Sequence, residues 1–161
     1  MSPDSGQTEN GRTDALYDAL REQAMRAVLF HLDVANRVGI SITDVGCLGV
    51  LDKEGAMSAG QLAERIGLSR GGAITAAVDR LERGGFVTRR RDTSDRRRVI
   101  VEIVRGGPYD RVVAALDSLS SAYRELIAGY DDTEARLLLD FTRRANAVVT
   151  EHLTGQPPTG R

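Results

Sequence analysis

Several residue types are scarce in this chain of 161 residues, and each scarcity narrows what the protein can be. Cysteine occurs once, at Cys47, so no disulfide can form within the chain and a reducing compartment is expected. With no tryptophan, three phenylalanines and four tyrosines, the core must be mainly aliphatic. No apolar run approaches the roughly 20 residues that span a bilayer, and the polar N-terminus lacks the apolar segment of a signal peptide. These absences predict a soluble, cytoplasmic protein with no membrane partner.

Charge is nearly balanced over the whole chain but not along it. The 22 basic and 23 acidic residues give a formal net charge of −1, which alone argues neither for nor against binding to nucleic acid. Between residues 80 and 98, however, arginine outnumbers the acids, whereas the N-terminus and residues 131–132 are acidic. The middle of the chain is therefore the region to examine for a nucleic-acid site.

The first part of that region, within residues 57–104, carries the pattern of two short helices. Ser58 is a favourable N-cap for the first helix, and Gly67 is typical of its end. Ser69 is a favourable N-cap for the second helix, which Gly84–Gly85 ends. Apolar residues of the second helix recur at helical spacing, as expected for one buried face: Ile74, Val78 and Leu81.

Two strands joined by a charged turn follow the second helix. The first strand becomes wholly basic at residues 89–91, and residues 92–95 favour a turn because Asp and Ser side chains bond nearby backbone amides. The chain returns through three arginines at 96–98 into a β-branched run at 99–104. A helix-turn-helix followed by a basic hairpin is a winged helix, whose usual partner is double-stranded DNA.

Long helices are predicted on both sides of this unit. On the N-terminal side, one helix starts near Thr13 or Asp14 and ends at Gly39, and a shorter one starts at Thr43 and runs to about Glu54. On the C-terminal side, Pro108 precedes a helix of roughly five turns, and a last helix starts at one of residues 131–133. Their apolar stripes exceed what one small winged helix needs, so a second copy of the chain is expected to cover them.

The sequence therefore predicts a mainly α fold with a small β-hairpin. One domain occupies residues 13–154, and a length of 161 residues suits a single domain. The predicted parts are a disordered tail at 1–12, dimerisation helices at 13–40 and 108–154, a winged helix-turn-helix lobe at 43–105 and a loose tail at 155–161.

The chain resembles the multiple-antibiotic-resistance regulator (MarR) family of bacterial winged-helix transcription factors. Two segments carry the resemblance, LAERIGLSRGGAITAAVDRLERGGFVTRR and, directly after it, RDTSDRRRVIVEI, with the motifs Asp79-Arg80-Leu81 and Asp95-Arg96-Arg97. The resemblance implies a homodimer that binds a pseudo-palindromic operator, most often as a repressor. It also implies a small, often aromatic ligand that binds between the dimer helices and the lobe and weakens DNA binding. Arg97 would enter the minor groove, and Asp95 would orient it.

We expect the DNA contacts to come from the start and exposed face of the recognition helix and from the wing. The predicted residues are Ser69, Arg70, Gly71, Gly72, Thr75, Ala76, Arg80, Arg90, Asp95, Arg96, Arg97 and Arg98. Gly71 and Gly72 have two interpretations: they allow the backbone to approach a phosphate closely, or they form a simple turn between the helices. Ala76 can meet a thymine methyl but cannot bond guanine. Asp79 is expected to pair with a neighbouring arginine rather than to face phosphate.

Tyr17, His31 and Cys47 are candidates to line an effector cleft, and each is equally explained as a core or dimer residue. For Cys47, a small core thiol is favoured over a sensor. One cysteine and two isolated histidines make a metal site improbable, and no cofactor or catalytic motif is present. The alternative function is a winged-helix module that binds a protein instead of DNA. The density of arginine in the wing argues against that alternative.

Overall fold

The structure is a computed structural model that describes residues 5–68, 71–93 and 95–154, with side chains from residue 11 to 153. The elements are, in order, α1 (Ser5–Val38), α2 (Ile42–Glu54), α3 (Ala59–Arg65), α4 (Gly72–Arg83), β1 (Val87–Arg91), β2 (Val99–Ile103), α5 (Tyr109–Ala128) and α6 (Asp132–Thr154). Helices predominate, and the described residues form a single two-stranded sheet. The predicted fold class is confirmed.

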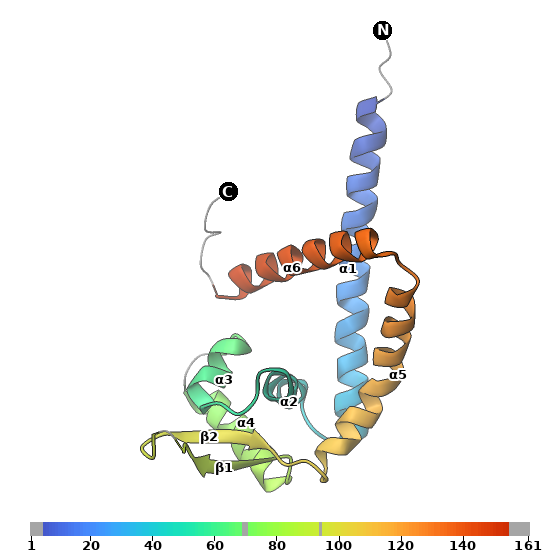
Figure 1. The fold of residues 1–161 in the computed structure, drawn as a ribbon. Helices are drawn as coiled ribbons and strands as arrows, with labels where there is room; N and C mark the ends of the chain where they lie inside the picture. Colours follow the sequence, from blue (N-terminus) through green and yellow to red (C-terminus); the bar gives the residue numbers. More distant parts are fainter. Residues whose placement is uncertain (1–4, 69–70, 94, 155–161) are drawn as a thin grey trace.

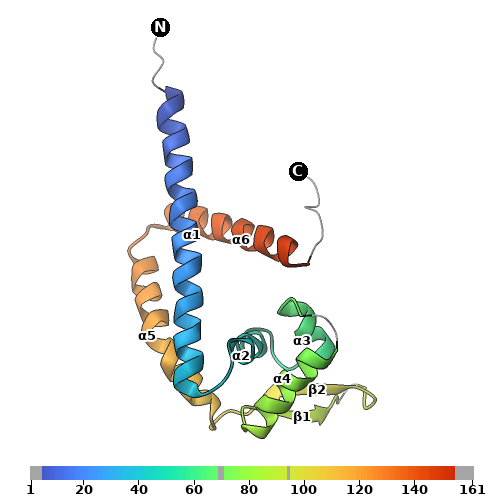
Figure 2. The same ribbon diagram turned by 180° about the vertical axis from the view of Figure 1, so that it is seen from behind.

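The elements divide into an arm and a lobe (Figures 1 and 2). The arm consists of α1, α5 and α6, and the lobe consists of α2, α3, α4 and the β1–β2 hairpin. α1 and α5 run beside each other, while α6 turns away from them and passes over the lobe (Figure 1). The lobe lies at the C-terminal end of α1, and the hairpin projects from it on the side away from α1. The hairpin is therefore free to reach a partner outside the molecule.

Helix ends follow local capping chemistry, with two corrections to the predicted boundaries. α1 begins at Ser5 rather than near Thr13. Ser41, not Thr43, caps α2: its hydroxyl accepts a hydrogen bond from the Asp44 N–H at 3.1 Å, and the Asp44 carboxylate accepts one from the Ser41 N–H at 3.1 Å. This reciprocal pair is a capping box. Ser58 makes the same arrangement at the start of α3, as predicted.

The hydrophobic core lies in the lobe and takes in only the adjoining parts of the arm. Its largest fully buried side chains include Leu48, Leu62 and Leu81, and Val112 joins them from the start of α5. Met57 adds a short third segment to the hairpin because its N–H and carbonyl both bond Val101. The core is aliphatic, as the shortage of aromatic residues predicts.

The arm keeps much of its apolar surface exposed. In α6, Leu137 is 70% exposed and Leu153 is 68% exposed, and no described residue of α6 is fully buried. α1 and α5 likewise expose apolar side chains: Leu16, Met25, Leu29, Leu126 and Ile127. Exposed apolar faces of this extent are typical of surfaces that another chain covers.

No single helix among the described residues is both long and apolar enough to cross a membrane. α1 and α2 meet that requirement only when they are taken together, and the chain bends by 98° between them.

Candidate nucleic-acid interface

α4 presents one face to the core and its opposite face to solvent. Ile74, Ala77, Val78 and Leu81 are buried, whereas the residues between them near the N-terminus of the helix are exposed: Gly72, Ala73, Thr75 and Ala76. The helix begins at Gly72 with Gly71 in the N-cap position. Ser69, the predicted cap, and Arg70 lie outside the described residues. The exposed face therefore carries small side chains at the end of the helix nearest the preceding turn.

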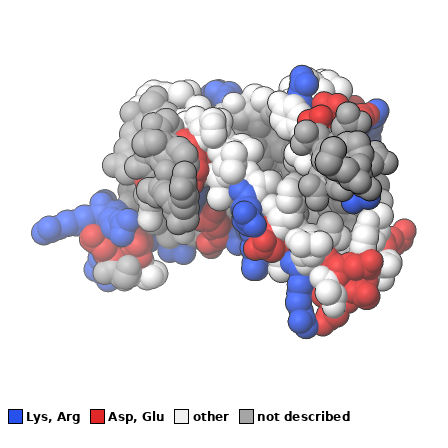
Figure 3. Space-filling model, turned by 90° about the horizontal axis from the view of Figure 1, so that it is seen from above, with Lys and Arg blue, Asp and Glu red and all other residues white. Residues whose placement is uncertain are grey.

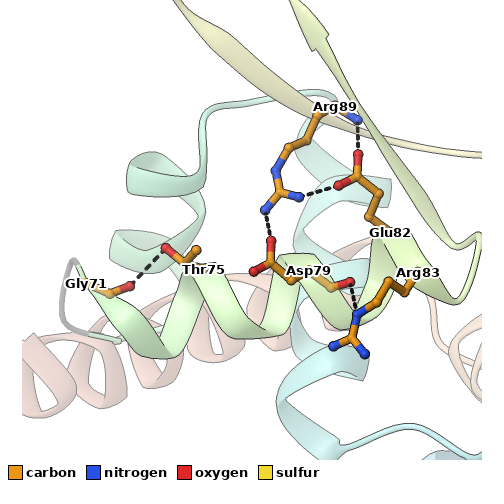
Figure 4. Close-up of polar contacts among 6 residues, drawn as sticks. All are labelled: Gly71, Thr75, Asp79, Glu82, Arg83 and Arg89. Carbon is orange, nitrogen blue, oxygen red and sulfur yellow. Dashed lines mark hydrogen bonds and ion pairs between the residues drawn. The ribbon is translucent and has the colours of Figure 1, made fainter.

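Thr75 provides the polar group on this face. Its hydroxyl donates a hydrogen bond to the Gly71 carbonyl at 3.3 Å (Figure 4). Because the hydroxyl can rotate away from this carbonyl, Thr75 keeps a donor and an acceptor for a base edge.

The structure gives Arg80, a predicted DNA contact, a partner within the lobe. Its guanidinium donates to the buried Asp44 carboxylate through Nη2 at 2.8 Å and Nε at 3.3 Å. The Arg80 side chain is 45% exposed and that of Asp44 is 3% exposed. The pair joins α4 to α2, and it raises the pKa of Arg80 through the hydrogen bond to Asp44. Sequence reasoning missed Asp44 altogether, although the Ser41-x-x-Asp44 spacing carries the signal of a capping box.

A second charged cluster joins α4 to the wing. Arg89 on β1 donates to Asp79 Oδ1 at 2.5 Å and to the Glu82 carboxylate, and its backbone N–H donates to Glu82 Oε1 at 3.0 Å (Figure 4). The expected pairing of Asp79 with an arginine is therefore confirmed. Arg83, on the same helix, donates to the Asp79 carbonyl at 3.2 Å instead. Arg89 thus fixes the hairpin against the recognition helix.

Within the hairpin, two arginines of β1 are also occupied. Arg90, a predicted DNA contact, pairs with Glu102 on the neighbouring strand at 2.5 Å. Arg91 donates to the Arg96 carbonyl at 2.9 Å, which holds the return of the chain against β1.

Asp95 shapes the tip of the wing through the backbone. Its carboxylate accepts a hydrogen bond from the Arg97 N–H at 3.0 Å, and the Arg98 N–H donates to the Asp95 carbonyl at 2.9 Å. The resemblance implied that Asp95 orients Arg97. In the structure the Asp95 carboxylate contacts the backbone N–H of Arg97 and closes the turn, and the orientation of the Arg97 side chain by Asp95 stays a prediction.

Three consecutive arginines at the tip are exposed: Arg96, Arg97 and Arg98. Within the described chain their side chains make no ion pair, in contrast to Arg65, Arg80, Arg89 and Arg90 of the lobe, which pair with carboxylates. In Figure 3, basic side chains reach beyond the rest of the molecule at the end where Figure 1 places the hairpin. Exposed arginine side chains that form no ion pair within the described residues are therefore concentrated at the tip of the hairpin.

The three candidate effector residues lie apart. Tyr17 is exposed and His31 is half-buried on α1, and the 14 positions between them correspond to about 21 Å along the helix. Cys47 is fully buried in the core of the lobe. A mostly apolar cavity of about 400 Å³ lies between α1 and α5 and includes none of the three; its lining includes Phe30, which contacts His31 edge to face. In the part of the chain that the structure describes, no cluster of three or more His, Cys, Asp or Glu side chains is placed to hold a metal ion.

The chain is similar to known transcriptional regulators in sequence and in fold. The sequence profile of the MarR family matches residues 40–99. The uncharacterized HTH-type transcriptional regulator YcgE of Bacillus subtilis (strain 168) is 34% identical over 149 residues, covering 91% of this chain and 96% of that protein. A MarR family protein from Bacillus stearothermophilus has a TM-score of 0.65 at 23% identity, covering 87% of this chain and 97% of that one. The transcriptional regulator BldR from Sulfolobus solfataricus has a TM-score of 0.54 at 28% identity, covering 91% and 99%.

Proposed function

This chain belongs to the MarR family of transcriptional regulators, and from that membership we propose that it acts as a homodimer that represses transcription from a pseudo-palindromic operator. The family consists of DNA-binding transcription factors, not enzymes. Two recognition helices related by a two-fold axis would read two half-sites about one helical turn apart, roughly 34–36 Å. The exposed apolar faces of the arm support the dimer, because a second arm is the surface best matched to cover them.

The arginines at the wing tip carry the proposal that the wing binds DNA. Arg96, Arg97 and Arg98 are exposed and make no ion pair within the described chain. Three adjacent guanidinium groups repel one another in the free protein, and a phosphate backbone relieves that repulsion. In this proposal Arg97 enters the minor groove, where the negative potential is strongest, and Arg98 binds phosphate.

The recognition helix has the smaller part in base readout. Its exposed N-terminal half offers Thr75 and Ala76, and Gly72 lets the backbone approach a phosphate. Arg80 and Arg90 enter the proposal only in a secondary role, because each already has a carboxylate partner.

We further propose that a small aromatic molecule releases the protein from DNA. The cavity of about 400 Å³ between α1 and α5 is within the size range of small-molecule sites, and Phe30, Tyr123 and the Glu22–Arg26 ion pair give it apolar walls with a polar edge. Such a ligand must favour a dimer whose recognition helices are wrongly spaced, because only a difference in affinity shifts the equilibrium. Among the candidate effector residues, His31 contacts Phe30, which lines this cavity.

Operator binding at several salt concentrations tests the proposal. The operator is first obtained by sequencing DNA that copurifies with the protein. Arg97→Ala is expected to weaken binding most on sites with A·T-rich flanks, because narrow minor grooves hold the guanidinium best. Arg98→Ala should weaken all sequences alike and lower the salt slope by about 0.9 for each phosphate that the protein no longer binds. Thr75→Ala should mainly change base preference, by about 1–3 kcal/mol for each disturbed pair.

Two results would count against this function. If both arginine variants keep the affinity and salt slope of the wild type, the wing does not touch DNA. If the wild type itself shows no salt-dependent binding to operator or random DNA, the chain is instead a winged-helix module for a protein partner.

A further inference from the structure

The Asp44 carboxylate is buried between α2 and the recognition helix α4, and both of its oxygens are occupied. Oδ2 accepts from the Ser41 N–H at 3.1 Å and from Arg80 Nε at 3.3 Å, and Oδ1 accepts from Arg80 Nη2 at 2.8 Å. Removing a buried carboxylate from water is costly, so its hydrogen bonds must all be kept. Asp44 therefore holds the first turn of α2 and the third turn of α4 in one arrangement.

Ser41 stands directly after the end of α1. The helix ends at Val38, and Gly39 follows with φ of 77°, a conformation that favours glycine, while its N–H still bonds the Ala35 carbonyl at 2.9 Å. Only Ile40 separates Gly39 from Ser41. A change in the direction of α1 therefore also moves Ser41, whose N–H donates to the Asp44 carboxylate.

α4 has no extensive packing of its own against the arm. α1 packs against α2 and α5, whereas α4 packs against α2, α3 and β1. A cleft of about 280 Å³ opens between the α1–α2 junction and the C-terminal half of α4, and Asp44 and Arg80 lie in its wall. The ion pair bridges α2 and α4 at the wall of this cleft, in addition to the apolar packing of the two helices in the core. Unlike apolar packing, a two-bond guanidinium–carboxylate pair fixes direction as well as distance.

We propose that Asp44 is a positioning residue for DNA recognition: by holding Arg80, it fixes the recognition helix relative to the arm. This inference rests on the proposed function, because it concerns how a dimer sets the spacing of its two recognition helices. In a dimer the arms determine the position of each lobe. The Asp44–Arg80 pair determines the orientation of α4 relative to the arm. Arg80 then acts through α4, not by touching DNA.

A series of operators with one base pair added or removed between the half-sites tests the assignment. Each base pair shifts a half-site by about 3.4 Å and rotates it by about 34–36°. The wild type should lose about tenfold or more in affinity on the altered operators, because its helices are held. Asp44→Asn, which keeps the shape and the bond to Ser41 but loses the charge, should bind the native operator about 5- to 100-fold more weakly. On the altered operators, the affinity of Asp44→Asn should fall by less than about threefold relative to its affinity for the native operator. Its salt slope should equal that of the wild type.

Glu54→Gln is the matched control. Glu54 also lies on α2 and pairs with an arginine at 2.7 Å, but its partner Arg65 is on α3. This variant should keep the spacing dependence of the wild type. If Asp44→Asn folds poorly, the uncharged double variant Asp44→Asn/Arg80→Met replaces it, because it leaves no unpaired charge. The double variant should show the same relaxed spacing, and its affinity should be no weaker than that of Arg80→Met alone.

Three outcomes overturn the inference, and they are distinguishable. Wild-type spacing dependence in Asp44→Asn and in the double variant means that the pair does not position α4. Tighter binding by Asp44→Asn, together with a salt slope lowered by about 0.9 per protomer in Arg80→Met, means that Arg80 itself binds phosphate. Absence of operator binding by the wild type overturns the proposed function and this inference with it.

Discussion

Cys47 lies in the middle of the lobe core, where its surroundings keep the thiol protonated. Burial, and next the nearby Asp44 carboxylate, raise its pKa to about 11 against the opposing effect of Arg80. At pH 8 only about one molecule in a thousand would carry the thiolate, which is the reactive form. A thiol with these properties is a core side chain and a poor redox sensor.

Cys47→Ala is therefore expected to keep operator affinity and the response to the effector. In the native wild type, a thiol reagent at pH 8 should react at least about tenfold more slowly than in denaturant, because the side chain is both buried and protonated. The rate of thiol modification tests the first property, and the operator affinity after oxidant treatment tests whether Cys47 acts as a sensor. Loss of an oxidant response in Cys47→Ala, with DNA binding intact, would identify Cys47 as the sensor after all.

Tyr109, at the start of α5, gives the molecule a pH-dependent contribution to stability. Burial and, next, a hydrogen bond to Asp52 together raise its pKa to about 12. Arg105 pairs with the same Asp52 at 2.8 Å and lies over the tyrosine ring. Because the pKa is higher in the folded state than in the unfolded chain, this contribution is complete below about pH 10. It is lost as the pH rises towards about 12.

Between pH 9 and pH 11 the wild type should lose about 1 kcal/mol more unfolding free energy than Tyr109→Phe does. The measurement is urea denaturation of both proteins at the two pH values. Tyr17→Phe, at an exposed tyrosine of α1, is the control and should follow the wild type. Parallel pH dependence in Tyr109→Phe and the wild type would show that the pKa of Tyr109 is no higher in the folded protein than in the unfolded chain.

At the scale of elements, Arg89 ties the β1–β2 hairpin to α4. It lies on β1 and contacts two carboxylates of α4, and its side chain is 27% exposed. Arg90, the next residue, pairs only within the hairpin and is 41% exposed. The two neighbours allow a comparison between an ion pair that joins elements and one on the surface of a single element.

Arg89→Met should lower the free energy of unfolding by about 1–2 kcal/mol, because it removes charge-assisted bonds between elements. Arg90→Met should change it by no more than about 0.5 kcal/mol, as is usual for exposed pairs. Arg89→Met should also weaken operator binding, since wing and helix no longer keep one relative angle. Equal effects of the two substitutions on stability would show that Arg89 has no special role.

At the scale of the whole molecule, the exposed apolar faces of the arm require a partner. On α6, Leu137 and Val148 are 70% and 53% exposed and lie on the same side of the helix as Phe141. Arg143 lies on the opposite side of the same helix. A second copy of the chain that covers the apolar side would leave Arg143 in solvent.

Leu137→Asp and Val148→Asp are expected to convert the dimer into a monomer, because an unpaired carboxylate cannot be buried in an apolar interface. The lobe should stay folded, since no described residue of α6 belongs to the buried core. Arg143→Asp, with the same new side chain, should remain dimeric. Sedimentation velocity gives the oligomeric state and circular dichroism the helix content. A dimer that persists in both apolar-face variants would place the interface elsewhere.

The sequence alone was sufficient to predict the fold class, the family and most helix ends. Ser58 and Gly67 bound a helix through bonds to residues only a few positions away, so their effect can be read locally. The wing was predictable for the same reason, because its strands are adjacent in sequence and its turn is closed by Asp95. The predicted start of α2 is wrong, because Ser41 and not Thr43 is the cap and forms a capping box with Asp44.

Only the tertiary structure decided which arginines are available to DNA. Arg80 and Asp44 are 36 positions apart, and no local pattern indicates that they meet. Arg89 likewise depends on how the hairpin packs on α4, which brings Asp79 and Glu82 within reach. An arginine is a cation in any sequence, but its charge is left for a partner only where the fold does not pair it with a carboxylate. Within the described residues of the wing tip, Arg96, Arg97 and Arg98 are exposed and form no ion pair, and the nearby Asp95 carboxylate accepts a hydrogen bond from the backbone N–H of Arg97.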